Sequence, residues 1–292
     1  MDLNKLKTFL VVAEYESISK AAIQLGYTQS GISHTLKRLE EEINLPLFHR
    51  NRNGVTLTNV GEELLPIVRN LISVNEQLDQ TIYSLQGIHK GDLTIGTFAS
   101  ISILWLPKVI HQFQLDYPDI KIHLKEGGIE EVQHWIQTNN VDLGFCSAQP
   151  DDDFDWIPLK QDPLLAILPK DYPIEGKDSF DIKNFKKQPF IMSAMGIDYD
   201  IHRVLQNGKV TPDVRFSSMD DYAIISMVEN KLGISILPEL IVKGHPSSNI
   251  LTLPLKPFAY RSLGIGIKSK KMASPATKKF IEYAIIYIKT QQ

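Results

Sequence analysis

The spacing of apolar residues between positions 17 and 43 constrains the fold more than any other feature of this 292-residue chain. A first group recurs at helical intervals, as Ile18, Ala21, Ala22 and Leu25. Ser17 can cap the start of the helix that these residues predict, and Gly26 falls where a helix ends on a left-handed residue. Thr28 is a suitable cap for a second helix. The segment therefore predicts two short helices joined by a tight turn.

The predicted second helix runs from about Gln29 to Ile43 and is amphipathic. Its apolar residues fall within one narrow sector, as Ile32, Leu36, Leu39 and Ile43. Gln29 lies on the first turn, where the recognition helices of helix-turn-helix proteins meet base edges, and polar groups on the other side can bond bases or phosphates. The residues predicted to contact DNA are Thr28, Gln29, Ser30, Ser33, His34, Lys37 and Arg38. The alternative is an amphipathic helical hairpin with a solvated face.

Residues 48–58 predict a β-hairpin after the second helix. Asn53 and Gly54 form a dipeptide typical of tight turns. Arg50 and Arg52 alternate along one side of the first strand, which suits contact with phosphate or with a minor groove. A surface hairpin with ordinary exposed arginines is the alternative. With the two helices, the hairpin predicts a winged helix-turn-helix that binds double-stranded DNA.

Many residue types at fixed spacing in this region match one family. They are Leu6, Phe9, Ser17, Ser19, Ala21, Ala22, Leu25, Gly26, Gln29, Ser30, Ile32, Ser33, Leu39, Glu40, Leu45, Leu47, Phe48, Arg50, Leu57, Thr58, Gly61 and Glu62. With them the chain resembles the LysR-type transcriptional regulators, and the resemblance continues through the rest of the sequence. It implies a regulator that binds a pseudo-palindromic promoter site as a homodimer or homotetramer, with RNA polymerase as a further partner. Family members usually carry Arg where this chain has His34, so contact of His34 with a base or with a phosphate stays open.

A heptad-like repeat follows the hairpin. Its apolar positions are Val60, Leu64, Ile67, Leu71, Val74, Leu78, Ile82 and Leu85, and the first five steps alternate between four and three residues. Because so short a segment holds nothing else to cover that stripe, we expect a long helix that pairs with a second copy of the chain. A helix packed on its own domain is the alternative. Pro66 is expected to kink or loosen its first turns, and residues 87–91 are expected to form a hinge.

After Gly91 the pattern alternates between strands and helices, which predicts parallel sheets. Strands are expected at 93–96, 120–124, 141–145, 164–168, 189–192, 214–216, 234–237 and 263–267, and helices at 102–117, 129–138, 197–205, 219–229 and 275–288. Two crossings, near Gln161-Asp162 and Gly264-Ile265, would make two α/β lobes with a hinged cleft. This arrangement resembles the periplasmic-binding-protein-like effector domain of the same family.

The predicted fold is therefore multidomain. Residues 1–58 form a winged helix-turn-helix, residues 59–90 a linker helix and hinge, and residues 91–292 an effector-binding domain. Within that domain, lobe I comprises 91–162 and 266–292, and lobe II comprises 163–265.

Ligands of open α/β sheets bind beyond the carboxyl ends of strands, at helix N-termini. The residues that meet this description are Thr97, Ser100, Ser102, Ser147, Ser193, Met195, Asp198, Ser218 and Asp220. For any one Ser or Asp, helix capping is the plain alternative. The resemblance implies a small, often carboxylated metabolite, yet these loops contain acidic residues and no Arg or Lys. Arg203 is expected on the solvated face of its helix.

Composition and motifs limit the other functions. The net charge is −3, and residues 1–90 hold nine Lys or Arg against ten Asp or Glu, so modest non-specific DNA affinity is expected. The sequence shows no P-loop, nucleophile elbow or HExxH motif and its His residues are scattered, so neither an enzyme, a cofactor nor a metal is predicted. A transport subunit is disfavoured because no export signal is visible, and no stretch reaches transmembrane length. The single Cys146 fits a cytoplasmic protein, in a buried apolar role or a redox one.

Overall fold

A computed structural model describes residues 2–51, 54–147, 153–174, 178–193 and 198–290, with the side chains of 198 and 199 outside that description. The chain forms two compact units. One comprises residues 1–88 with 138–140, and the other comprises 89–137 with 141–292.

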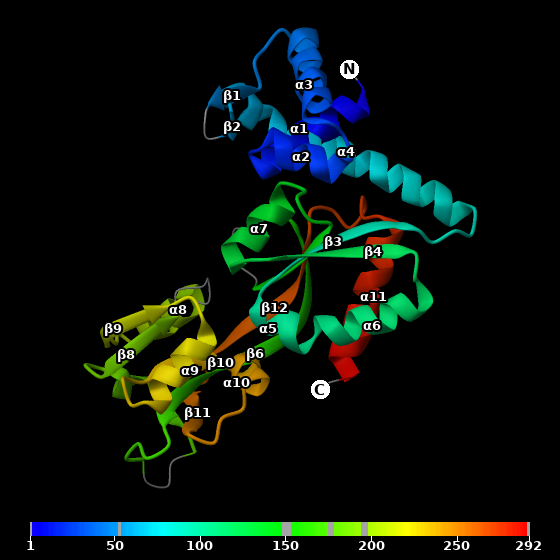
Figure 1. Cartoon of the computed structure of the whole chain (residues 1–292). Helices are drawn as coiled ribbons and strands as arrows, with labels where there is room; N and C mark the ends of the chain where they lie inside the picture. Colours follow the sequence, from blue (N-terminus) through cyan, green and yellow to red (C-terminus); the bar gives the residue numbers. More distant parts are fainter. Residues whose placement is uncertain (1, 52–53, 148–152, 175–177, 194–197, 291–292) are drawn as a thin grey trace. The chain divides into compact units, whose positions relative to one another are not determined.

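The N-terminal unit is a winged helix-turn-helix followed by a long helix (Figure 1). Its elements are α1 (Leu3–Tyr15), α2 (Ile18–Leu25), α3 (Gln29–Ile43), β1 (Phe48–Asn51), β2 (Gly54–Leu57) and α4 (Asn59–Leu85). Side chains from α1, α2 and α3 close one core, in which Phe9, Val12 and Leu36 are at most 1% exposed. The buried residues Ala21 and Ala22 of α2 and Ile32, Leu36 and Leu39 of α3 lie on the apolar faces that the spacing predicted.

Local capping explains the two-helix turn. The hydroxyl of Ser17 accepts a hydrogen bond from the backbone N–H of Lys20 at 3.3 Å. Gly26 ends α2 with φ of 69°, a left-handed conformation that favours glycine. Thr28 then caps α3, because its Oγ1 accepts from the N–H of Gly31 at 3.1 Å. All three capping predictions are confirmed.

The first turn of α4 packs closely against the backbone that leads into the wing. Strands β1 and β2 pair antiparallel, with Phe48 opposite Leu57. A Cβ atom at Gly61 would lie 2.4 Å from the carbonyl oxygen of Leu47, so only glycine lets the first turn of α4 come this near. Thr58 caps α4 and donates its hydroxyl to the carbonyl of Pro46 at 2.8 Å. The helix is continuous through Pro66.

The C-terminal unit contains a mixed sheet of order β4-β3-β5-β12-β6-β11-β7, with β10 also paired to β6, and a separate β8-β9 pair. The strands are β3 (Gly91–Thr97), β4 (Ile120–Glu126), β5 (Leu143–Ser147), β6 (Asp155–Pro169), β7 (Phe180–Asp181), β8 (Pro189–Ser193), β9 (Asp213–Ser218), β10 (Ser235–Pro238), β11 (Ile250–Lys256) and β12 (Tyr260–Ile267). The helices are α5 (Ala99–Leu104), α6 (Leu106–Asp116), α7 (Ile129–Gln137), α8 (Asp198–Asn207), α9 (Asp221–Glu229), α10 (Glu239–Gly244) and α11 (Pro275–Thr290), with a short 3-10 turn at Ile182–Phe185.

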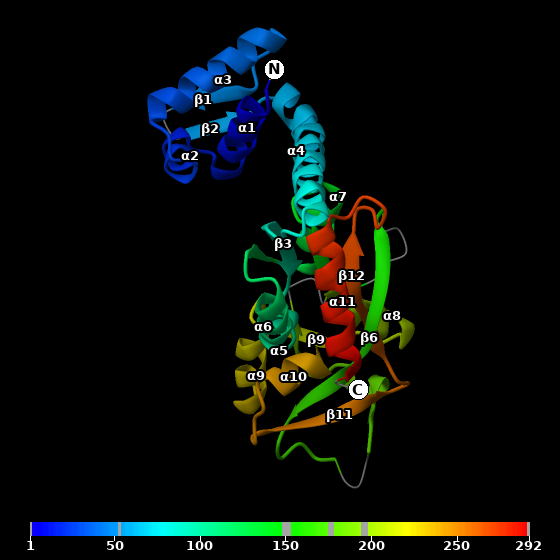
Figure 2. The ribbon, with the colours of Figure 1, turned by 90° about the vertical axis from the view of Figure 1, so that its right-hand side faces the viewer.

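Two lobes share the long strand β6. Its first half pairs antiparallel with β12, which also pairs with β5, while its second half pairs with β10 and β11. In the first lobe β3 is parallel to both β4 and β5. Figure 2 shows β6 and β12 running side by side from one lobe towards the other. The architecture is the two-lobed α/β domain that the sequence predicted.

Several elements differ from the sequence prediction. The single helix expected at 102–117 is two helices, α5 and α6, which meet at Trp105, and Pro107 lies in the first turn of α6. Proline suits a first turn because it lacks the N–H that would stay unpaired there. The strand expected at 164–168 is only the second half of β6, and β11 and α10 were not predicted at all. Across the described residues, no helix has the length and apolar character needed to cross a bilayer.

Candidate functional site

The first turn of α3 presents polar groups to solvent. Thr28, Gln29 and Ser30 are exposed, while Ile32, Leu36 and Leu39 on the opposite face are at most 1% exposed. Further along the helix His34, Lys37 and Arg38 are also exposed, and Ser33 is half-buried. Nζ of Lys37 lies 3.6 Å from Oε1 of Glu41, one helical turn further along. The predicted DNA-contacting residues of α3 therefore share one accessible face.

Arg50 on the wing is bonded to that face. Its Nη1 donates to Oγ of Ser33 at 2.8 Å, and its Nη2 lies 3.9 Å from Oε2 of Glu40. Glu40 in turn accepts the backbone N–H groups of Leu47 and Phe48 on its Oε1, at 2.8 and 3.2 Å. Glu40 thus fixes the wing to α3, a role that the sequence analysis missed. Arg52 lies outside the described residues.

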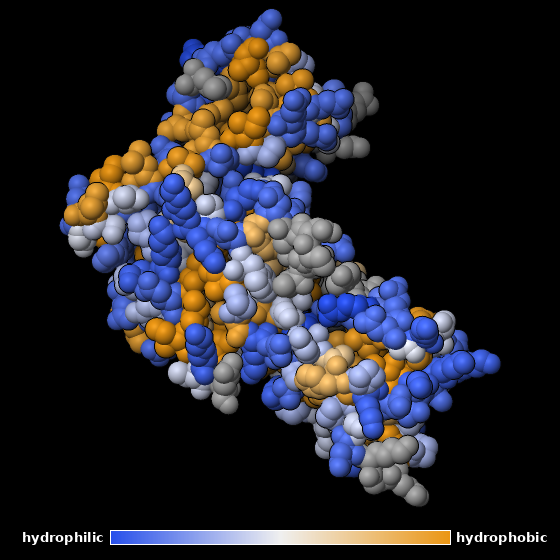
Figure 3. Space-filling model, turned by 180° about the vertical axis from the view of Figure 1, so that it is seen from behind, coloured by the Kyte–Doolittle hydropathy of each residue, from blue (hydrophilic) through white to orange (hydrophobic). Residues whose placement is uncertain are grey.

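An apolar stripe runs along the outer part of α4. Figure 3 shows hydrophobic side chains gathered over this helix. The exposed members of the predicted heptad stripe are Ile67, Leu71, Val74, Leu78, Ile82 and Leu85, at 42% to 84% exposure. The first half of α4 packs on the helix-turn-helix core, where Val68 and Ile72 are buried and Val60, Leu64 and Leu65 are partly buried.

In the C-terminal unit, the predicted effector residues are hydrogen-bonded to protein groups. Ser102 donates to Oγ1 of Thr97 at 3.3 Å, and Asp220 caps α9 through the N–H of Tyr222 at 2.9 Å. Ser218 accepts from the N–H of Asp220 at 3.1 Å. Ser100, Ser147 and Ser193 each bond a charged side chain. Met195 and the side chain of Asp198 lie outside the described residues.

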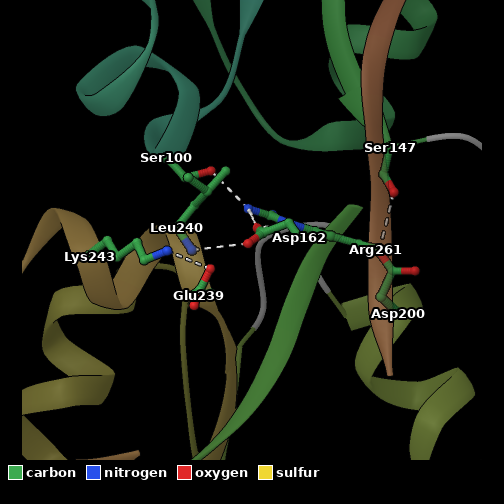
Figure 4. Close-up of polar contacts among 8 residues, drawn as sticks. All are labelled: Ser100, Ser147, Asp162, Asp200, Glu239, Leu240, Lys243 and Arg261. Carbon is green, nitrogen blue, oxygen red and sulfur yellow. Dashed lines mark hydrogen bonds and ion pairs between the residues drawn. The ribbon is translucent and has the colours of Figure 1, made fainter. Parts of the chain in front are cut away.

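Arg261 and Asp162, which the sequence analysis did not select, form the centre of this region. They face each other in the register of β12 and β6. Nε and Nη2 of Arg261 both lie 2.8 Å from Oδ2 of Asp162, and the two side chains are 0% and 1% exposed. Nη2 also donates to Oγ of Ser100 at 2.9 Å, and Oδ1 of Asp162 accepts the N–H of Leu240 at 3.1 Å (Figure 4). The pair therefore joins α5, β6, β12 and α10.

Two further buried carboxylates accompany this pair. Ser147 donates to Oδ2 of Asp200 at 3.3 Å, and Ser193 donates to Oδ1 of Asp221 at 3.2 Å. Burial raises the pKa of Asp200, against the opposing charges of Arg203 and Arg261. Burial also raises the pKa of Asp221 to about 6, again opposed by Arg261. We call Ser100, Ser147, Asp162, Asp200, Asp221 and Arg261 the junction cluster.

Arg203 reaches this cluster from α8. Its Nη2 donates to Oδ1 of Asp200 at 2.8 Å and to the carbonyl of Tyr260 at 3.3 Å, and its side chain is 44% exposed. Arg203 lies on the exposed face of α8, as expected, and from there its guanidinium also bonds the buried Asp200. Among the described residues no group of three or more His, Cys, Asp or Glu is arranged to hold a metal ion. Cys146 on β5 is buried in the core of the unit.

A winged helix-turn-helix joined by a long helix to a two-lobed α/β domain defines a class of DNA-binding regulators that respond to small molecules. Two family models divide the chain in the same way. Residues 3–62 match the bacterial regulatory helix-turn-helix protein of the lysR family, and residues 86–285 match the LysR substrate binding domain. The chain belongs to the LysR family of bacterial transcriptional regulators, not to a family of enzymes.

Two of the similar proteins match this chain over nearly its full length, and a third matches its C-terminal part. The uncharacterized HTH-type transcriptional regulator YvbU of Bacillus subtilis is 31% identical over 286 residues, which cover 97% of this chain and 98% of that protein. A full-length OxyR variant from Pseudomonas aeruginosa has a TM-score of 0.78 at 23% identity, covering 99% of this chain and 95% of that one. The regulatory domain of CcmR from Synechocystis, solved in complex with 2-PG, has a TM-score of 0.63 at 24% identity and covers 68% of this chain and 97% of that one. The solved structures show that the fold is shared.

Proposed function

We propose that two copies of this chain bind a pseudo-palindromic promoter site, each inserting the first turn of α3 into a major groove. The observation that carries this proposal is the exposure of Thr28, Gln29 and Ser30 on that turn, opposite a buried apolar face. Recognition helices contact base edges through their N-terminal residues. Gln29 suits adenine, since its amide can donate and accept at the same base edge. Ser33, His34, Lys37, Arg38, Arg50 and Arg52 complete the proposed contact surface.

The second copy pairs through α4. An exposed stripe of aliphatic side chains spaced by three and four residues is typical of a helix that packs against another helix. A twofold pair would present its two recognition helices to an inverted repeat. Further assembly to a homotetramer would let the protein bridge two such sites on one promoter. The proposed location is the cytoplasm, where a regulator of this kind would meet promoter DNA.

The C-terminal unit is proposed to bind a small-molecule effector between its lobes. The 2-PG complex of the CcmR regulatory domain supports this, because that domain shares the fold. The domains in this proposal are residues 1–58, 59–90 and 91–292, with lobe I at 91–162 and 266–292 and lobe II at 163–265. The proposed effector residues are Thr97, Ser100, Ser102, Ser147, Ser193, Met195, Asp198, Ser218 and Asp220. The effector would act by binding more tightly to one arrangement of the dimer than to another.

The test is a gel shift and footprint with DNA from upstream of the chain's own gene. Gln29→Ala should weaken binding to the protected site about 10-fold or more, as expected for a lost bidentate contact, and leave binding to random DNA unchanged. Gln86→Ala, an exposed glutamine after α4, is the matched control and should bind normally. Equal losses on specific and random DNA would contradict base reading by Gln29. Transcription with purified RNA polymerase on the same promoter then separates activation from repression.

A further inference from the structure

The junction cluster contains more buried negative than positive charge. Asp162, Asp200 and Asp221 are between 1% and 9% exposed, and each interacts with the charge of Arg261. Arg203 supplies the second cation, at Asp200. Two guanidinium groups therefore face three carboxylates.

One end of Arg261 has no acceptor. Its Nε and Nη2 are satisfied by Asp162 and Ser100, but Nη1 is buried and has no hydrogen-bond partner in the described structure. The ring of Phe98 lies over the guanidinium, 5.3 Å from ring centroid to Cζ, and offers Nη1 no acceptor because the N–H groups lie in the guanidinium plane. A buried, charged donor left without an acceptor is unfavourable. The described residues of the site therefore provide no acceptor oxygen for Nη1.

The excess of buried carboxylates and the unpaired Nη1 of Arg261 together indicate which charges a ligand should carry. A simple carboxylate would satisfy Nη1 but would add another negative charge to a cluster that is already acidic. A simple amine would balance the acidic side chains but would leave Nη1 without an acceptor and add a cation near it. A ligand that carries both groups meets both requirements at once.

We propose that the effector is a small zwitterion of the α-amino acid class, whose carboxylate accepts from Nη1 of Arg261 and whose ammonium group donates to Asp221. This inference rests on the proposed function, which places an effector between the lobes. Asp221 is chosen because its hydrogen bond comes from the neutral hydroxyl of Ser193, whereas Asp200 already bonds Arg203. Arg261 is enclosed in the described state, so the ligand enters when the lobes separate about β6 and β12.

The experiment is calorimetric titration of the full-length protein with each of the twenty protein L-amino acids, followed by two derivatives of the tightest binder. Its N-acetyl derivative lacks the ammonium charge, and its carboxamide lacks the carboxylate. Both derivatives should bind about 10-fold or more weakly than the parent, as expected when a charged hydrogen bond is lost. An N-acetyl derivative or a carboxamide that binds as well as the parent overturns the proposal, and so does a failure of all twenty amino acids to bind.

Variants locate the ammonium group. Asp221→Asn should weaken binding of the amino acid about 10- to 100-fold and remove its advantage over the N-acetyl derivative. Asp213→Asn, an exposed aspartate of the same lobe, is the matched control and should bind like the wild type. Unchanged discrimination in Asp221→Asn would contradict the assignment of Asp221, whereas a merely destabilised site would weaken both compounds equally.

Failure of this inference can be distinguished from failure of the proposed function. If 2-hydroxy acids or simple carboxylates bind and change the footprint while amino acids do not, an effector exists but its class is wrong. If the protein does not protect its own upstream DNA at all, the proposed function fails whatever the titrations show.

Discussion

Arg50 of the wing donates a 2.8 Å hydrogen bond to Ser33 on the outer face of α3, so two residues proposed to contact DNA also hold each other. Glu40 supports the same connection, because its Oε2 lies 3.9 Å from Nη2 of Arg50 and its Oε1 accepts the backbone N–H groups of Leu47 and Phe48. In the proposed complex, the wing and α3 would therefore meet DNA already joined to each other. Their geometry is set before binding, which lowers the ordering cost of association.

Arg50→Ala is expected to weaken binding to specific and random DNA alike. In the proposed complex the side chain contacts phosphate, so its loss should reduce the slope of log K against log salt by about one. The measurement is a series of binding titrations between low and moderate salt on both DNAs. Gln86→Ala, far along the chain from the wing, should keep the wild-type slope. A loss confined to the specific site would instead assign Arg50 to base reading.

The buried pair of Arg261 and Asp162 makes a second prediction, about stability. Arg261→Gln leaves Asp162 buried without its cation, and such a loss destabilises a protein by about 3–5 kcal/mol. Adding Asp162→Asn removes the orphaned charge, so the double variant should be more stable than Arg261→Gln alone. Denaturant unfolding of the wild type, both single variants and the double variant measures the coupling. Additive effects would show that the two side chains do not stabilise each other.

Much of the N-terminal unit could be predicted from the sequence because local rules determine it. Ser17, Gly26 and Thr28 act through their nearest backbone neighbours, and the apolar spacing of α3 and α4 is visible within each helix. The break between α5 and α6 at Trp105 has one local signal, Pro107, because proline suits the first turn of a helix better than its interior. The prediction of a single helix at 102–117 placed Pro107 in the interior and therefore missed the break.

The buried pair of Asp162 and Arg261 in the C-terminal unit could not be predicted, because it forms only through the register of two strands. Asp162 and Arg261 are 99 residues apart and become neighbours only when β6 and β12 align. A search limited to loops after strands finds Ser100, Ser147 and Ser193 and the acidic loop residues, but not Arg261 or Asp162. The one local signal was Arg261, two residues before the strand expected at 263–267. A buried arginine requires a buried acid beside it, but the burial of Arg261 was not predictable locally, because β12 begins three residues earlier than expected.

Leu78→Glu is expected to break the proposed pairing of α4. Leu78 lies within the apolar stripe and is 56% exposed in the single chain, so a charge there would be buried only when two copies associate. The variant should sediment as a smaller species than the wild type and should footprint its promoter only at much higher concentration. Gln86→Glu adds the same charge beside the stripe and should leave the assembly intact. A Leu78→Glu protein of unchanged size would show that α4 is not the pairing surface.

Asp221 predicts a pH dependence with a definite sign. Burial raises its pKa from 3.8 to about 6, while Arg261 and Ser193 oppose the shift and the neighbouring Asp220 adds to it. Between these two pKa values the folded protein binds more protons at this residue than the unfolded chain does, so its contribution to stability falls as pH rises through the window. The shift of about two units corresponds to about 3 kcal/mol of unfolding free energy that the wild type loses above pH 6.

Asp221→Asn does not ionise, so its free energy of unfolding relative to the wild type should rise from pH 4 to pH 7.5 and then level off. Denaturant unfolding at a series of pH values measures this difference, and Asp213→Asn controls for the loss of an exposed carboxylate. A difference that stays constant with pH would show that Asp221 ionises in the folded protein as it does in the unfolded chain.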